Sequence, residues 1–152
     1  MKIGAYQFAV TGNIDKNTEC SLMAMNQALE QKVRLLVFPE CALTGYPPYD
    51  IGSSSCIDVD KVMNSLKTIQ RAADQMDIYV VVGAIVKENG FHNSAVIISP
   101  NCPMQVYHKR ALFGWDAENF VSSHKPGVFA VDGFKIGVRI CFEVRFPEYF
   151  RE

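Results

Sequence analysis

The chain begins with short apolar runs that are typical of strands buried in a sheet. Lys2–Val10 is rich in apolar and aromatic residues and is the first predicted strand. Arg34–Phe38 is a nearly continuous apolar run, which indicates a strand covered on both faces. This second strand brings Pro39 and Glu40 to its carboxyl end. Runs of this kind are expected in the parallel part of an α/β sheet.

Two longer segments carry apolar side chains at the helical period. Apolar or small residues recur along one face in the first of them, which predicts a helix over 15–33 with Asn13 or Asp15 as its cap. Val59–Met76 repeats the pattern and predicts a second helix, capped by Asp58. Both helices are amphipathic, so each is expected to lay one face on the sheet.

From residue 78 onward the pattern changes from helices to hairpins. Asn89-Gly90 and Asp132-Gly133 are strong turn signals between β-rich runs. The predicted strands are Ile78–Lys87, His92–Ser99, Met104–His108, Val128–Val131 and Phe134–Ile140. Together with the two helices they predict an α/β fold, a mixed sheet with helices on one face. The sequence has no internal repeat or linker, so we predict one domain over residues 1–152.

Composition and charge exclude several classes of partner. The chain is 49% hydrophobic and 20% charged, and 15 Lys+Arg against 16 Asp+Glu give a net charge of −1. Without a basic patch, nucleic acid is not an expected partner. The apolar runs are too short for a secretory signal or a membrane helix, so no membrane association is expected. We predict a soluble cytoplasmic protein.

The cysteines and histidines do not form a recognisable metal or disulfide pattern. The five cysteines are an odd set without C-x-x-C spacing, which indicates a reducing compartment. His92, His108 and His124 have no i, i+4 pairing and no adjacent set of carboxylates. We therefore predict neither a metal site nor a cofactor.

Cys141 is the strongest candidate for chemistry. Read alone, a free cysteine is typical of a small core hydrophobe. Its position changes that interpretation, because it follows the strand that ends at Ile140 and precedes a short helix predicted over Pro147–Glu152. Ligands of open α/β sheets bind at the carboxyl ends of strands. A nearby helix N-terminus or cation there would lower the pKa of the thiol.

Three further residues are candidates at other predicted strand ends or loops. Glu40 follows a strand in an apolar setting that would raise the pKa of its carboxyl group, which suits a general base. Its neighbour Cys41 is interpreted as structural, since adjacent side chains tend to point apart. Lys109 follows the strand ending at His108, and Glu118 lies in an aromatic-rich loop. Each of these charges, taken singly, is typical of a solvated surface residue.

Taken together, these motifs resemble the carbon–nitrogen hydrolase (nitrilase) superfamily. The segments that carry the resemblance stand in the family's order: Phe38-Pro39-Glu40, Leu43-Thr-Gly-Tyr46, Tyr107-His108-Lys109, Lys125-Pro-Gly127 and Ile140-Cys141-Phe-Glu-Val-Arg-Phe-Pro-Glu148. The resemblance implies an α-β-β-α sandwich, of which this chain would hold the N-terminal portion only, ending soon after the nucleophile segment.

The resemblance also implies a catalytic arrangement and a substrate class. Glu40 would be the general base, Lys109 the oxyanion stabiliser, Cys141 the nucleophile and the backbone N–H of Phe142 a second oxyanion donor. Glu118 matches, more loosely, a second glutamate of many members. The implied reaction is hydrolysis of a small-molecule amide or nitrile through a thioester, with release of ammonia.

Two other functions remain open at this point. Because the chain is shorter than family members, it would expose an apolar face, and we expect either self-association into a homo-oligomer or little activity. A non-catalytic fragment or interaction module of the same fold is therefore one alternative. The segment Leu43–Pro48 also resembles the glutaminase portion of glutamine-dependent NAD synthetases, which is the other alternative.

Overall fold

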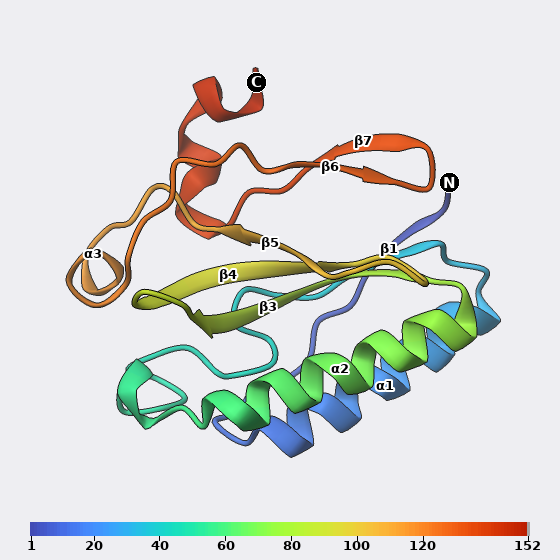
Figure 1. Cartoon of the computed structure of the whole chain (residues 1–152), viewed down its shortest axis with the longest axis horizontal. Coiled ribbons are helices and arrows are strands. Elements are labelled where there is room, and N and C mark those ends of the chain that lie inside the picture. The colour runs from blue at the N-terminus through green and yellow to red at the C-terminus, as the bar shows by residue number, and fades with distance from the viewer. Residues whose placement is uncertain (152) are drawn as a thin grey trace.

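The protein, seen here as a computed structural model, is described over residues 1–151. Within that range one sheet has the strand order β1-β2-β3-β4-β5, parallel from β1 to β3 and antiparallel from β3 to β5 (Figure 1). The strands are β1 (Ile3–Ala5), β2 (Leu35–Val37), β3 (Tyr79–Lys87), β4 (Phe91–Ile98) and β5 (Gln105–His108). The predicted mixed sheet is confirmed.

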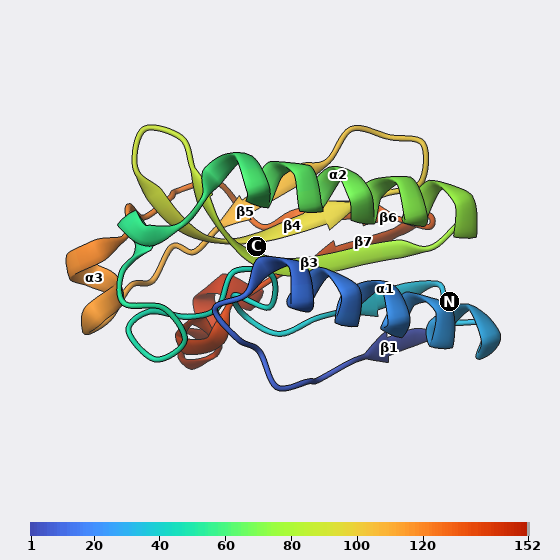
Figure 2. The same cartoon turned by 90° about the horizontal axis from the view of Figure 1, so that it is seen from below.

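Helices α1 (Ile14–Glu30) and α2 (Val59–Met76) lie side by side on one face of this sheet (Figures 1 and 2). The side chain of Asn13 accepts a hydrogen bond from the Lys16 backbone N–H, and that of Asp58 accepts one from Lys61. Such caps satisfy backbone donors that the first helical turn leaves unpaired. Both helices and the cap positions Asn13 and Asp58 are therefore confirmed.

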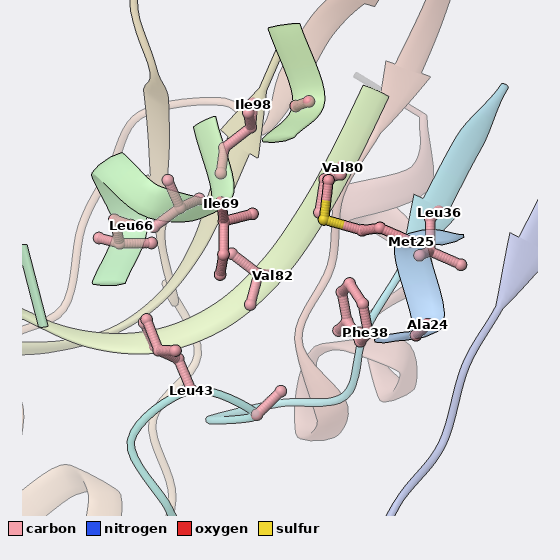
Figure 3. Packing of buried hydrophobic residues seen from close by; sticks show 14 of the residues in the cluster. Ala24, Met25, Leu36, Phe38, Leu43, Leu66, Ile69, Val80, Val82 and Ile98 are labelled. Carbon is pink, nitrogen blue, oxygen red and sulfur yellow. The ribbon is translucent and has the colours of Figure 1, made fainter. Parts of the chain in front are cut away.

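The face between helices and sheet holds the larger apolar core. Figure 3 shows side chains from both helices meeting those of the central strands. Buried members of this cluster are Ala24 and Met25 of α1, Leu66 and Ile69 of α2, Leu36, Val80, Val82 and Ile98 of the sheet, and Phe38 and Leu43 of the loop after β2. Residues 1–151 contain no helix with the length and hydropathy needed to cross a membrane.

A hairpin covers the opposite face of the sheet. Strands β6 (Val128–Val131) and β7 (Phe134–Gly137) form a separate antiparallel pair above the sheet, on the side away from α1 and α2 (Figure 1). Val131 and Ile140 pack there against a second apolar cluster that includes Tyr107 of β5. The central sheet is thus buried between helices on one side and strands on the other, as an α-β-β arrangement requires.

The first helix and two strands end earlier than predicted. Helix α1 ends at Glu30 rather than at residue 33, and Lys32 after it has φ of 56°, which turns the chain toward β2. The first strand stops at Ala5 because its partner β2 is short and leads into Pro39, which has no N–H to donate. The last strand stops at Gly137 rather than Ile140; Val138 still donates to Gly127, but Pro126 ends the partner strand.

The segments around the last two candidate residues also differ from expectation. Pro147–Phe150 forms a 3-10 helix, and the predicted end of that helix at residue 152 lies outside the described residues. Helix α3 (Trp115–Asn119) was predicted as a loop. It is a single turn begun at Gly114 without a side-chain cap, so it lacks the usual signals of a helix start.

Gly83 of β3 lets the turn that carries Glu40 pass directly over the sheet, and Gly83→Ala is expected to destabilise the fold. A Cβ there would lie 2.2 Å from the Pro39 carbonyl oxygen and 2.5 Å from the Cys41 nitrogen. Overpacking against backbone atoms costs about 3 kcal/mol in unfolding free energy. Urea unfolding would measure it, with Gly137→Ala as the control, since a Cβ there meets nothing within 4 Å. Equal losses in the two variants would contradict this account.

Candidate active site

Glu40 lies in a tight turn directly after β2. The next residue, Cys41, has φ of 51°, and Leu43 donates its backbone N–H to the Gly83 carbonyl at 2.9 Å. These contacts fold the turn back over β3 and aim the Glu40 side chain across the sheet rather than into solvent. The carboxylate keeps 22% of its side-chain surface exposed, so it remains accessible from outside.

Lys109 lies just past the end of β5 and points its ammonium group at Glu40. Its side chain is 3% exposed, and Nζ lies 2.7 Å from Glu40 Oε1 and 2.7 Å from Asp116 Oδ2. Burial disfavours the charged form, but the hydrogen bonds to Asp116 and Glu40 outweigh burial and raise the pKa of Lys109. The lysine is therefore a buried, permanently charged ammonium between two carboxylates.

Two neutral donors hold these carboxylates in place. Asn93 of β4 donates from Nδ2 to Glu40 Oε1 at 2.7 Å, and its backbone oxygen accepts from the Lys109 N–H at 2.8 Å. The Tyr46 hydroxyl donates to Asp116 Oδ1 at 2.5 Å. Burial and this hydrogen bond raise the pKa of Tyr46, so it stays a neutral donor. Asn93 was not predicted; it lies between His92 and Ser94 at the polar start of a β-rich run, and nothing in that pattern marks it.

Cys141 approaches the same carboxylate from the other side. It opens a 3-10 helix, Cys141–Arg145, with φ of 46°, so the sharp turn after the last strand is confirmed. Its thiol lies close enough to Glu40 and to the Phe142 backbone N–H for both groups to act on its pKa. The residue is exposed and borders a cavity of about 100 Å³ that Glu40, Gly83 and Ile140 also line.

The electrostatics of this thiol differ from the expectation of a lowered pKa. Partial burial is the largest cause and raises the pKa of Cys141, and the negative charge of Glu40 raises it further. Lys109 and the Phe142 N–H act in the opposite direction without outweighing them. A thiol in this setting stays protonated at rest, and the adjacent carboxylate is placed to accept its proton when it reacts.

Cys41 and Glu118 are not part of this arrangement. Cys41 is fully buried, its sulfur donates to Asn93 Oδ1 at 3.7 Å, and burial raises its pKa well above the ordinary value. These contacts agree with its structural interpretation. Glu118 is exposed on α3, whereas Asp116 of the same helix is buried on Lys109. The acid that the structure brings to Lys109 is therefore Asp116.

Glu143 ties the nucleophile turn to the segment after Lys109, and it was not predicted. Its side chain is fully buried, and Oε2 accepts the Ile140 N–H at 2.6 Å. Oε1 accepts the Tyr107 hydroxyl at 2.7 Å and the Arg110 N–H at 2.6 Å. The carboxylate thus satisfies backbone donors from both sides and sets the distance between Cys141 and Lys109.

Replacing Glu143 by glutamine is expected to destabilise the protein by about 3 kcal/mol. The amide of glutamine would turn an N–H₂ group toward buried donors, and an unsatisfied buried donor costs about 1–3 kcal/mol. Chemical denaturation would measure the loss. Glu148→Gln is the matched control, since Glu148 is exposed on the next 3-10 helix. A Glu143→Gln protein as stable as the control would show that this carboxylate does not hold the turn.

The site therefore consists of a carboxylate and a thiol on one small cavity, with a buried ammonium 2.7 Å from the carboxylate. The chain matches the carbon–nitrogen hydrolase family over residues 2–152. It belongs to this family. The family assignment and the predicted fold are thereby confirmed.

Similar carbon–nitrogen hydrolases include both synthetases and amidases. A glutamine-dependent NAD(+) synthetase of Acinetobacter baylyi is 31% identical over 150 residues, which are 94% of this chain and 27% of the synthetase. An (R)-stereoselective amidase of Pseudomonas sp. is 30% identical over 120 residues, 77% of this chain and 42% of the amidase. The structure of an amidase from Nesterenkonia sp. has a TM-score of 0.86 at 24% identity, covering 99% of this chain and 59% of that one. The chain therefore spans less than two thirds of each relative.

Proposed function

We propose that the protein hydrolyses the C–N bond of a small-molecule amide, with Cys141 as nucleophile, Glu40 as base and Lys109 as oxyanion stabiliser. The observation that carries this proposal is the position of the Glu40 carboxylate. It lines the same cavity of about 100 Å³ as Cys141 and lies 2.7 Å from the Lys109 ammonium. A base in reach of both the nucleophile and the cation is what acyl transfer through a thiol needs.

The first half of the reaction forms a thioester. Glu40 takes the thiol proton as the sulfur of Cys141 attacks the amide carbon, and negative charge develops on the carbonyl oxygen. Two of the three ammonium hydrogens of Lys109 contact Glu40 and Asp116, which leaves one for that oxygen. The Phe142 N–H is the second donor, and one such donor is worth about 3 kcal/mol of barrier. Glu40 then protonates the leaving nitrogen, and ammonia departs.

The second half of the reaction releases the acid. Water attacks the thioester carbon while Glu40 accepts one of its protons, and the same donors hold the oxyanion. Collapse of the intermediate expels the thiolate, which regains its proton from Glu40. One water is consumed and one carboxylic acid and one ammonia are formed for each amide. Asp116 takes no proton in this scheme; it fixes the Lys109 ammonium through its 2.7 Å contact.

Ammonia release from a panel of compounds tests this function. The panel contains simple aliphatic amides, the matching nitriles and L-glutamine, and release from the amides is expected. A strong preference for glutamine would favour the glutaminase alternative, which the 31% identity to an NAD(+) synthetase over 94% of this chain supports. No release from any member of the panel would contradict the proposal and favour a non-catalytic member of the fold.

We also propose that the chain self-associates into a homo-oligomer. Val128 and Phe134 of the β6–β7 hairpin are exposed at 41% and 52%, although they belong to apolar strands. Covering such side chains in a second copy removes apolar surface from water. Light scattering after size-exclusion chromatography tests this proposal, and a monodisperse monomer would contradict it.

A further inference from the structure

Two of the histidines lie together on the face of the sheet opposite the candidate active site. His92 of β4 and His108 of β5 stack with ring centroids 4.1 Å apart, and Glu88 in the preceding hairpin turn lies beside them. Side chains alternate along a strand, so His92 and Asn93 point to opposite faces. The ligand-capable atoms of Glu88, His92 and His108 all lie within 4.8 Å of one another. They line an open hollow of about 540 Å³.

The hydrogen bonds of His92 determine which ring nitrogen carries its proton. Nδ1 lies 2.8 Å from the backbone oxygen of Val121. A carbonyl oxygen only accepts hydrogen bonds, so Nδ1 is protonated and Nε2 of a neutral ring carries a lone pair. Nε2 lies 3.0 Å from Asn89 Oδ1, and a rotation of this exposed amide brings its nitrogen, a donor, to the Nε2 lone pair instead. His92 therefore presents an acceptor nitrogen to the hollow.

The same reasoning applies to His108. The Ser94 hydroxyl lies 3.1 Å from the His92 backbone oxygen and 2.8 Å from His108 Nδ1. When it donates to the backbone oxygen it accepts from Nδ1, and in this tautomer the lone pair is on His108 Nε2. Nε2 lies 3.2 Å from Glu88 Oε1, so one cation can contact both atoms.

We propose that Glu88, His92 and His108 bind a divalent transition-metal ion, with Zn²⁺ as the best match. Two imidazoles and one carboxylate are a ligand set that zinc prefers over calcium or magnesium, and water would complete a tetrahedron. Metal-bound histidines usually donate their other ring N–H to a carbonyl or similar acceptor. Both histidines have that second partner here, in Val121 and Ser94.

A metal ion at this position would join separate parts of the chain. Glu88 belongs to the β3–β4 turn, His92 to β4 and His108 to β5, while Val121 belongs to the segment that crosses the strand ends. His108 directly precedes Lys109 in the chain. The ion would therefore stabilise the strand ends that carry Asn93 and Lys109 without touching the proposed substrate cavity.

Zinc titration of the whole chain tests this site. Isothermal titration with zinc chloride is expected to show binding, and saturating Zn²⁺ is expected to raise the thermal midpoint by about 5 °C or more. His92→Ala and His108→Ala are expected to weaken binding at least about ten-fold. Glu88→Gln should do the same and cannot endanger the fold, because the Glu88 side chain is 57% exposed. The cysteines are present in every variant, so differences between variants report this site alone.

His124→Ala is the matched control, since His124 is an exposed histidine that lines the same hollow. It is expected to bind Zn²⁺ as the unchanged protein does. The proposal is overturned if the unchanged protein shows no binding, or if the Glu88, His92 and His108 variants bind equally well. A loss in His124→Ala as large as that in His92→Ala would overturn the assigned ligand set.

Discussion

Replacing Cys141 by alanine is expected to abolish ammonia release while leaving the unfolding free energy almost unchanged. The proposed reaction has no covalent step without this sulfur, so activity should fall by at least about a thousand-fold. Cys141 is exposed, and alanine would meet the same positive φ of 46°, so the change in stability is expected to stay within about 1 kcal/mol. Ammonia release and urea unfolding measure the two effects.

Cys102→Ala is the matched control for this prediction. Cys102 is also exposed, and it lies in the turn between β4 and β5. Its replacement is expected to change neither activity nor stability. Turnover that survives in Cys141→Ala would refute the nucleophile assignment. A large loss of stability in that variant would show instead that the thiol has a structural role.

Replacing Lys109 by methionine is expected to remove activity and also to destabilise the protein. Methionine has a similar volume but no charge, so Glu40 and Asp116 would lose the ammonium that lies 2.7 Å from each of them. Removing one partner of a buried ion pair costs about 3–5 kcal/mol, because the remaining charge is buried without compensation. Assayed below its own unfolding transition, the variant is still expected to be inactive, since the main oxyanion donor is gone.

The control for Lys109 is an exposed lysine. Lys67→Met on α2 removes the same charge from a solvated position and is expected to change the unfolding free energy by no more than about 0.5 kcal/mol. Equal stability of the two variants would mean that the cluster of Lys109, Glu40 and Asp116 contributes nothing to the fold. An active Lys109→Met protein would remove the lysine from the proposed mechanism.

The two helices and the central hairpin were predictable because local signals determine them. Period-3.6 apolar residues and the caps Asn13 and Asp58 mark α1 and α2, and Asn89-Gly90 marks the central hairpin. Strand ends were less predictable. A strand ends where its partner strand stops donating hydrogen bonds, as at Pro39 and Pro126. Its end is therefore determined by both paired segments together and cannot be read from the sequence of one of them.

Only the site residues that lie at strand ends and in family motifs were predictable from the sequence. These are Glu40, Lys109 and Cys141, which the structure brings together. Asp116 could not be chosen over Glu118, because a single helical turn of unpredicted orientation decides which of two nearby acids faces the lysine.

Residues that act across the chain were missed for a related reason. Glu143 accepts backbone N–H groups from two segments of the chain. One of these donors, Arg110, lies 33 residues before Glu143 in the sequence. His92 and His108 show no helical spacing, yet strand pairing stacks their rings. Such contacts arise from tertiary structure and leave no local pattern in the sequence.

The pH dependence of thiol alkylation at Cys141 tests the pairing of nucleophile and base most directly. Iodoacetamide labelling, mapped by peptide mass in the unchanged protein and in Glu40→Gln, needs no knowledge of the substrate, and exposed Cys102 is the internal reference. Because Glu40 raises the pKa of the Cys141 thiol, its neutralisation should lower that pKa. Labelling of Cys141 is expected to begin at lower pH in Glu40→Gln than in the unchanged protein. Identical pH profiles in the two proteins would contradict this expectation.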